Sequence, residues 1–273
     1  MRFNVNYAEE NNVPPSTIAG INQLPYPEKR EVYTRLIPSI LLEHLNIDPS
    51  LKDADGNDLI TLKCSLSSPS VEMSLNHQIG FPDPVLYGHL ADTLNGQIHV
   101  LLYILNDPDS PRFDVDRLPD GTPTKFGTYS RNIQAEVAAM KAGLAPGQIR
   151  RGLRMLSHAV EGFEIFIQSL QHNLYFVEPL YYHNAIIFER YGFAYQKGNR
   201  LMRRIQSGFS DGGEFLTQLD GSNPFRKLEA VNSIRLRSWA IHDGILGEPF
   251  QNVTMYKQIG KSANVVTCPD CSW

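Results

Sequence analysis

The chain has 273 residues, of which 42% are hydrophobic and 20% are charged, and its formal net charge is −4. This composition is typical of a globular protein that buries a sizeable core. The acidic balance argues against the broad basic surface that binds nucleic acid. The longest strongly apolar run, residues 100–105, falls far short of the roughly 20 residues that cross a bilayer. The first residues are polar and lack the apolar middle of a signal peptide, so we expect no membrane partner and a cytoplasmic location.

Residues 1–57 are expected to form an N-terminal extension and a helix packed on a main domain of residues 58–273. The helix is indicated by a stripe of Val32, Leu36 and Ile40, which Pro38 interrupts. Alternating apolar segments between residues 58 and 106, separated by turns such as Asn95-Gly96, predict a largely antiparallel sheet. The stretch "DADGND" resembles a calcium loop but has Gly56 at the wrong position, which favours a plain turn.

The second half of the chain contains several helical patterns. Residues 131–143 predict a helix that ends at Gly143, and residues 148–170 carry an apolar stripe at steps of four and three, which predicts a long helix. Next come a strand at 174–177, a helix at about 183–190 and a strand from Phe193 onward. We expect an insertion at about 206–249, with a helix at about 224–241, and a last strand near 251–260. The fold class that follows is α+β, with a mixed, mostly antiparallel central sheet flanked by helices.

The segment of residues 152–195, "GLRMLSHAVEGFEIFIQSLQHNLYFVEPLYYHNAIIFERYGFAY", resembles the GNAT superfamily of acetyl-coenzyme-A-dependent N-acetyltransferases. In that family the short helix usually reads Asn-x-x-Ala-x-x-x-Tyr-x-x-x-Gly-Phe. Aligned on Gly192-Phe193, this chain has Phe188 at the tyrosine position and Asn184 one helical turn before it. The resemblance implies a GNAT-like fold and an acyl-coenzyme A as cofactor.

The family holds the coenzyme's pyrophosphate on a loop, Arg/Gln-x-x-Gly-x-Gly/Ala, that opens the long helix. This chain offers two partial matches, one at Gly143-Leu144-Ala145 and one that pairs Gln148 with Gly152. The resemblance therefore implies a coenzyme site made from Gly143, Ala145, Gly147, Gln148, Arg151 and Gly152, together with Asn184 and Phe188. The alternative is a plain turn between two helices, with Pro146 near the start of the second.

Phe188 has no proton to donate to a departing thiolate, so Tyr182 or Tyr191 is the candidate donor. Glu178 and His183 are the candidate general bases, because burial can move the pKa of either group toward neutrality. Each of these residues has a structural alternative as a capping, packing or core side chain.

The expected function is transfer of an acetyl or other acyl group from acetyl-coenzyme A, or another acyl-coenzyme A, to a small-molecule amine. The alternative is a catalytically inactive GNAT-like protein that binds a small molecule or joins subunits, for example in a homodimer. Phe188 and the incomplete loop favour this alternative.

Two further groups of residues suggest metal or redox chemistry only weakly. Histidines and aspartates are scattered over the predicted sheet and the loop after it, without the close spacing of a metal site, so no metal is expected; they are His77, His89, His99, Asp92, Asp114 and Asp116. Cys268 and Cys271 form a Cys-x-x-Cys pair that is compatible with a loose tail, a shared metal site or a redox pair. The charged stretch around Arg112 is either a self-satisfied ionic turn or a substrate clamp.

Overall fold

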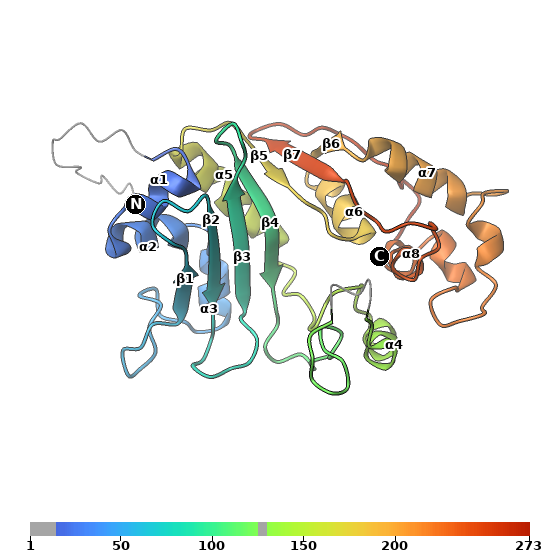
Figure 1. The fold of residues 1–273 in the computed structure, drawn as a ribbon, viewed down its shortest axis with the longest axis horizontal. Helices are drawn as coiled ribbons and strands as arrows, with labels where there is room; N and C mark the ends of the chain where they lie inside the picture. Colours follow the sequence, from blue (N-terminus) through green and yellow to red (C-terminus); the bar gives the residue numbers. More distant parts are fainter. Residues whose placement is uncertain (1–14, 125–129) are drawn as a thin grey trace.

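A seven-stranded sheet forms the centre of the computed structural model, which describes residues 15–124 and 130–273. The strand order is β1-β2-β3-β4-β5-β7-β6. All neighbouring strands are antiparallel except β4 and β5, which are parallel. The strands are β1 (Ile60–Lys63), β2 (Ser70–Leu75), β3 (Leu86–Asp92), β4 (Ile98–Leu105), β5 (Leu174–Val177), β6 (Ala194–Lys197) and β7 (Thr254–Gln258). Helices flank the sheet (Figure 1), which confirms the predicted mixed, mostly antiparallel α+β fold.

The first four strands confirm the antiparallel sheet predicted for residues 58–106. Along β2, Val71, Met73 and Leu75 are buried and the residues between them are partly exposed. This alternation is what a strand with one covered face requires, because successive side chains point to opposite sides. The "DADGND" turn is also confirmed, because the Asp53 carboxylate accepts hydrogen bonds from the backbone of Asp55 and Asn57.

Three short helices precede the sheet, where the sequence predicted one helix after an irregular extension. They are α1 (Ile18–Gln23), α2 (Tyr26–Thr34) and α3 (Ser39–His44). The sequence carries a local signal for α1 that the prediction overlooked, because the Thr17 side chain caps the helix by accepting a hydrogen bond from the Gly20 N–H. The Asp92 carboxylate, at the end of β3, also accepts hydrogen bonds from the backbone of Ile18 and Ala19. The side chain of Tyr103 on β4 donates to the Leu36 carbonyl and packs against Phe163, so the N-terminal helices and α5 cover the same face.

The helix α5 spans Leu156–Ser169, so the predicted start at residue 148 is wrong. Residues 148–153 instead run beside the end of β4, where Asn106 bridges Gly152 and the Leu153 N–H donates to the Leu105 carbonyl. Arg150 holds this segment in place: its side chain is 9% exposed and its Nε lies 2.8 Å from the buried Asp83 carboxylate. A distant ion pair therefore overrides a local helical pattern.

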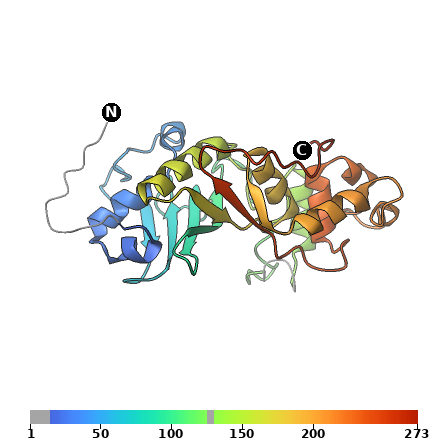
Figure 2. The same ribbon diagram turned by 90° about the horizontal axis from the view of Figure 1, so that it is seen from above.

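The segment β5, α6 (Tyr182–Arg190) and β6 agrees with the sequence prediction within a residue or two. The strand predicted from Phe193 onward is short, because Gly198 adopts φ 96° and the helix α7 (Asn199–Phe209), which the sequence analysis did not predict, begins directly after it. The helix predicted at 224–241 is shorter than expected: a 3₁₀ turn at Leu228–Val231 precedes α8 (Ile234–His242). In both views α7 and α8 lie at the end of the molecule opposite α1 and α2 (Figures 1 and 2).

The C-terminal segment is packed and cross-linked, so the loose-tail alternative is wrong. Cys268 and Cys271 form a disulfide and are 4% and 8% exposed. The buried Glu189 carboxylate accepts hydrogen bonds from the backbone and side chain of Thr267, which anchors the segment to α6.

The charged stretch around Arg112 is an ionic turn, because Arg112 pairs with Asp83, Asp114 and Asp116. The helix α4 (Ile133–Lys141) follows this turn, and Gly143, just after its C-terminus, adopts φ 90° as expected for a glycine at that position. Within the described residues no group of three or more potential metal ligands comes together, and none of the described helices is long and apolar enough to cross a membrane.

Candidate functional site

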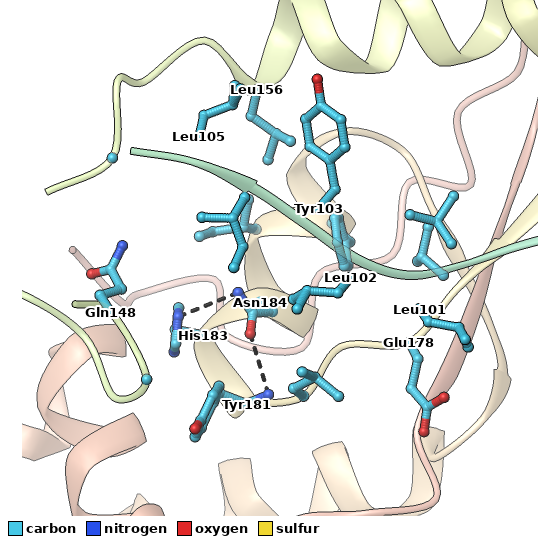
Figure 3. A pocket seen from close by; sticks show the side chains of 18 of the residues that line it. Leu101, Leu102, Tyr103, Leu105, Gln148, Leu156, Glu178, Tyr181, His183 and Asn184 are labelled. Carbon is cyan, nitrogen blue, oxygen red and sulfur yellow. Dashed lines mark hydrogen bonds between the residues drawn. The ribbon is translucent and has the colours of Figure 1, made fainter. Parts of the chain in front are cut away.

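A pocket of about 240 Å³ lies where β4 and β5 separate. The ladder between these strands has only two residue pairs, His99 with Phe176 and Val100 with Val177, although β4 continues to Leu105. The β5 side of β4 therefore lacks a strand partner from Leu101 to Ile104, and the pocket follows this free edge (Figure 3). Free backbone donors and acceptors along a strand can pair with an extended ligand.

A β-bulge lies at the start of the free edge. His89 of β3 pairs with Leu102 and Leu90 pairs with Val100, so Leu101 is the extra residue on β4. A bulge leaves its residue outside the ladder and bends the strand, and bulges are common beside active sites. The bulge at Leu101 marks the point where β4 and β5 part.

Most of the pocket wall is apolar. Side chains of β4, α5 and α6 contribute Leu102, Leu105, Leu156, Val160, Ile187 and Phe188. Gln148 and Glu178 lie on opposite sides of the labelled group, and His183 and Asn184 lie between them (Figure 3). A mostly apolar pocket with a few polar groups can hold a ligand that has a flexible apolar arm.

The segment before α5 forms one end of the pocket. Gly147 adopts φ 78° and lies against the Tyr181 ring, so closely that an added Cβ would be 2.4 Å from a ring carbon. Arg151 and Arg154 are exposed on this segment, beside the first turn of α5. Exposed arginines beside a helix N-terminus produce a positive potential that favours anions.

The helix α6 forms the opposite wall, and Asn184 stabilises its first turn. The Asn184 side chain accepts a hydrogen bond from the Tyr181 N–H (3.2 Å), which satisfies one of the free donors at the helix start (Figure 3). The Asn184 amide nitrogen lies 3.3 Å from His183 Nε2. Asn184 therefore fixes the positions of Tyr181 and His183, and all three side chains line the pocket.

Seven of the predicted site residues line the pocket: Gly147, Gln148, Gly152, Glu178, His183, Asn184 and Phe188. The other five lie outside the lining: Gly143, Ala145, Arg151, Tyr182 and Tyr191. The structure thus brings together the second of the two partial loop matches, the one around Gln148 and Gly152. Gly143 and Ala145 belong to the turn after α4, where the Ala145 N–H already donates to Gln148 Oε1.

Neither predicted tyrosine lines this pocket, although Tyr182 lines a second pocket that is described below. Tyr182 is 1% exposed, and burial raises its pKa while the nearby Arg237 guanidinium acts in the opposite direction. Tyr191 caps the end of α6, and its carbonyl accepts a hydrogen bond from Lys257. The expectation that one of them stands in for the family's tyrosine has no support in this geometry.

His183 is a poor base despite its position in the wall. Its side chain is 3% exposed and its Nδ1 lies 2.9 Å from Ser238 Oγ. Burial, together with the nearby His242, lowers the pKa of His183 to about 3. The expectation that burial brings this histidine near neutrality is therefore wrong, because desolvation disfavours the charged imidazolium.

Glu178 keeps an exposed carboxylate at the rim of the pocket, directly after β5. Its backbone N–H donates to the Val100 carbonyl and closes the short β4–β5 ladder. His99 lies close to it, and burial lowers the pKa of His99 while the Glu178 charge acts to raise it. Of the two predicted bases, Glu178 is the one that solvent and a ligand can reach.

Sequence reasoning missed a second pocket of about 620 Å³, which α8 and the loop after it form. It shares Leu180 and Tyr181 with the first pocket. The residues that contribute chemistry here, Glu136 and His242, lie 106 positions apart in the sequence, so no short motif could reveal them.

The chain was compared with protein-family models, curated proteins and solved structures, and none of them matches it.

Proposed function

We propose that the protein is an acyl-coenzyme-A-dependent N-acyltransferase with a fold of the GNAT type. The observation that carries this proposal is the apolar pocket at the split between β4 and β5, with a free strand edge along one side. The chain order β4, α5, β5, α6 and β6 around that pocket supports it, since this is the order of strands and helices on which the resemblance rests.

The residues around the pocket fit an acyl-coenzyme A in three respects. The free edge of β4 offers backbone groups to the two amides of the pantetheine arm. The side chains of Leu156, Val160 and Phe188 exclude water from the arm's apolar parts. Arg151 and Arg154, exposed beside the first turn of α5, would bind the phosphates. When bound, the coenzyme supplies an acyl group activated as a thioester.

The backbone at the bulge contributes electrostatics. A backbone N–H that a bulge leaves outside the ladder can donate to an oxygen that gains negative charge during acyl transfer. Leu101 is the residue in that position. Glu178, at the rim, would accept the proton that the amine loses.

A second candidate function is binding without transfer. Phe188 lines the pocket at the position where the family usually has its proton-donating tyrosine, and neither Tyr182 nor Tyr191 reaches the same space. In this reading the apolar pocket retains a small molecule, and no acyl group moves. Turnover distinguishes the two functions, because both predict that a ligand binds in the pocket.

Isothermal titration calorimetry with acetyl-coenzyme A tests the proposal. We expect the wild-type protein to bind, Leu156→Trp to lose binding because the indole fills the pocket, and Ile165→Trp to bind normally. Leu156 lines the pocket, whereas Ile165 is 63% exposed on the same helix, so the pair separates pocket filling from a general effect on α5. No heat of binding at millimolar coenzyme would refute the proposal.

A further inference from the structure

The second pocket adjoins the first through Leu180 and Tyr181, which line both. Tyr182 and Arg131 also line it, and its remaining walls come from α8 and from residues 243–251, which lie outside the segment that resembles the GNAT superfamily. A ligand in this pocket would meet the contents of the first pocket at the Tyr181 side chain. This arrangement suits a reaction between two substrates that enter from different sides.

His242 lines the second pocket and is held by a buried carboxylate. Its Nε2 lies 3.1 Å from Glu136 Oε1, and the Glu136 side chain is 3% exposed. Burial acts to raise the pKa of Glu136, but hydrogen bonds from His242 and Arg131 outweigh it, so the pKa is lowered and the group is ionised. A carboxylate only accepts hydrogen bonds. Nε2 of His242 is therefore the nitrogen that donates to Glu136.

Tyr181 connects His242 to the first pocket. The centroid of its ring lies 5.7 Å from the centroid of the His242 ring, in an edge-on contact. It also lies 5.7 Å from the centroid of the His183 ring, in a stacked contact. His183 is engaged with Ser238 through Nδ1, whereas His242 is engaged with Glu136 through Nε2. Of the two histidines beside Tyr181, His242 lines the second pocket and is the one that a buried carboxylate holds through a ring nitrogen, the arrangement found in many general bases.

We propose that the second pocket binds the acceptor, a primary amine carried on an apolar or aromatic body, and that His242 is the base that removes its proton. This inference rests on the proposed acyltransferase function and assigns the base to His242 instead of Glu178. Glu136 is a positioning residue, because it acts through the imidazole.

The charges of the pocket favour an amine over an amino acid. Among the described residues that line it, Arg131 carries the permanent positive charge, and its guanidinium is already paired with Glu136 and Asp243. No lining arginine is thus free to bind a substrate carboxylate. Both lining carboxylates are paired as well, Asp243 with Arg131 and Arg226 and Glu248 with Arg204. Leu180, Ile241, Pro249 and Phe250 provide apolar surface. An uncharged amine on an apolar body needs no ionic partner, so it fits this lining better than an amino acid does.

The transfer step balances with these groups alone. The neutral amine nitrogen attacks the thioester carbonyl carbon, so an N–C bond forms, and the proton that nitrogen loses goes to Nδ1 of His242. The C–S bond then breaks, and its electron pair leaves on sulfur as a thiolate. The imidazolium gives its proton to the thiolate, so the products are an amide and a free thiol, and His242 is again neutral.

Amine binding is tested without turnover by NMR of the histidine C–H signals, with 2-phenylethylamine as the probe. The His242 signals, assigned by their loss in His242→Gln, should shift on titration with the amine in the absence of coenzyme. Gln251→Trp, which narrows the pocket, should weaken the shift at least tenfold, and Gln134→Trp on the exposed face of α4 should not. If the amine leaves the His242 signals unchanged, the inference is wrong, whatever the coenzyme does.

Kinetics test the role of His242. With acetyl-coenzyme A and 2-phenylethylamine, His242→Gln should lower kcat/KM about 10²–10⁴-fold, as expected for loss of a general base. Glu161→Gln, on the exposed face of α5 and outside the linings of both pockets, should change it less than threefold, and the binding constant for coenzyme should stay the same in both variants. Glu136→Gln should lower kcat/KM in the wild-type background but not in His242→Gln, because it acts through that ring.

Three outcomes separate the two proposals. Equal turnover of wild type and His242→Gln overturns the inference and leaves the acyltransferase proposal intact. A large loss of kcat/KM in Glu178→Gln with no loss in His242→Gln assigns the base to Glu178. This result also overturns the inference and leaves the acyltransferase proposal intact. Absence of coenzyme binding, with the amine still shifting the His242 signals, overturns the acyltransferase function and supports the second pocket as an amine site.

Discussion

Gly147 supports the Tyr181 side chain, and replacing it by alanine should disturb both pockets. Two costs add at this position. A residue with a Cβ at φ 78° lies in the left-handed region, which costs about 1–2 kcal/mol. The new Cβ would also lie 2.4 Å from one Tyr181 ring carbon and 2.7 Å from both a second ring carbon and the hydroxyl oxygen, and such overpacking costs typically about 1–3 kcal/mol. We therefore expect Gly147→Ala to lower the free energy of unfolding by about 2–5 kcal/mol.

Gly143→Ala is the matched control, because Gly143 has φ 90° but nothing lies within 4 Å of its added Cβ. It should lose only the backbone cost, so the two variants should differ by about 1–3 kcal/mol in urea unfolding. For a chain of this size that is about 2–5 °C in melting temperature. The Gly147 variant should also weaken coenzyme binding, while the Gly143 variant should not. Equal losses in the two variants would show that Tyr181 does not pack on Gly147.

Three further predictions follow from buried groups. His183 has a folded-state pKa of about 3 against 6.5 when unfolded, so its contribution to stability is complete above pH 6.5 and is lost as the pH falls toward 3. Urea unfolding of wild type should therefore lose about 4 kcal/mol more than His183→Gln between pH 7 and pH 3, and parallel pH profiles would contradict this. Asp83→Ala strands two arginine side chains and should cost about 3–5 kcal/mol, against under about 1 kcal/mol for the exposed Asp114→Ala; similar losses would show that Asp83 is not a buried anchor. Reduction of the Cys268–Cys271 disulfide, which closes a loop with a sequence separation of 3, should cost about 2 kcal/mol in thermal unfolding, and a melting temperature unchanged by dithiothreitol would argue against the bond.

Local patterns were sufficient to predict the strands and the helix α6. The segment from Leu174 to Lys197 contains apolar runs of the right length and ends its helix at Gly192, so each element follows from its own residues. The start of α5 could not be predicted in this way. Its apolar stripe extends back to residue 149, but Arg150 is held by Asp83, which lies 67 positions away. Contacts at that separation leave no periodic signal in the sequence.

The candidate site shows the same limit. The resemblance to the GNAT superfamily was the reason for predicting Gln148, Gly152, Asn184 and Phe188 as site residues. All four line the first pocket. The resemblance to the GNAT superfamily did not point to the second pocket. Its Glu136–His242 pair becomes visible only when the packing of α4 against the end of α8 is known.

The place of β7 in the sheet has a consequence for how the chain folds. β7 lies between β5 and β6, and Leu174 pairs with Gln258, 84 residues later in the chain. Closing so long a loop is entropically costly, so this half of the sheet should form late and slowly. Until it does, β5 and β6 have no partner between them, and unpaired strand edges promote aggregation. A chain interrupted within the α7–α8 segment should therefore be recovered mainly as aggregate, even though most of the pocket residues precede the break.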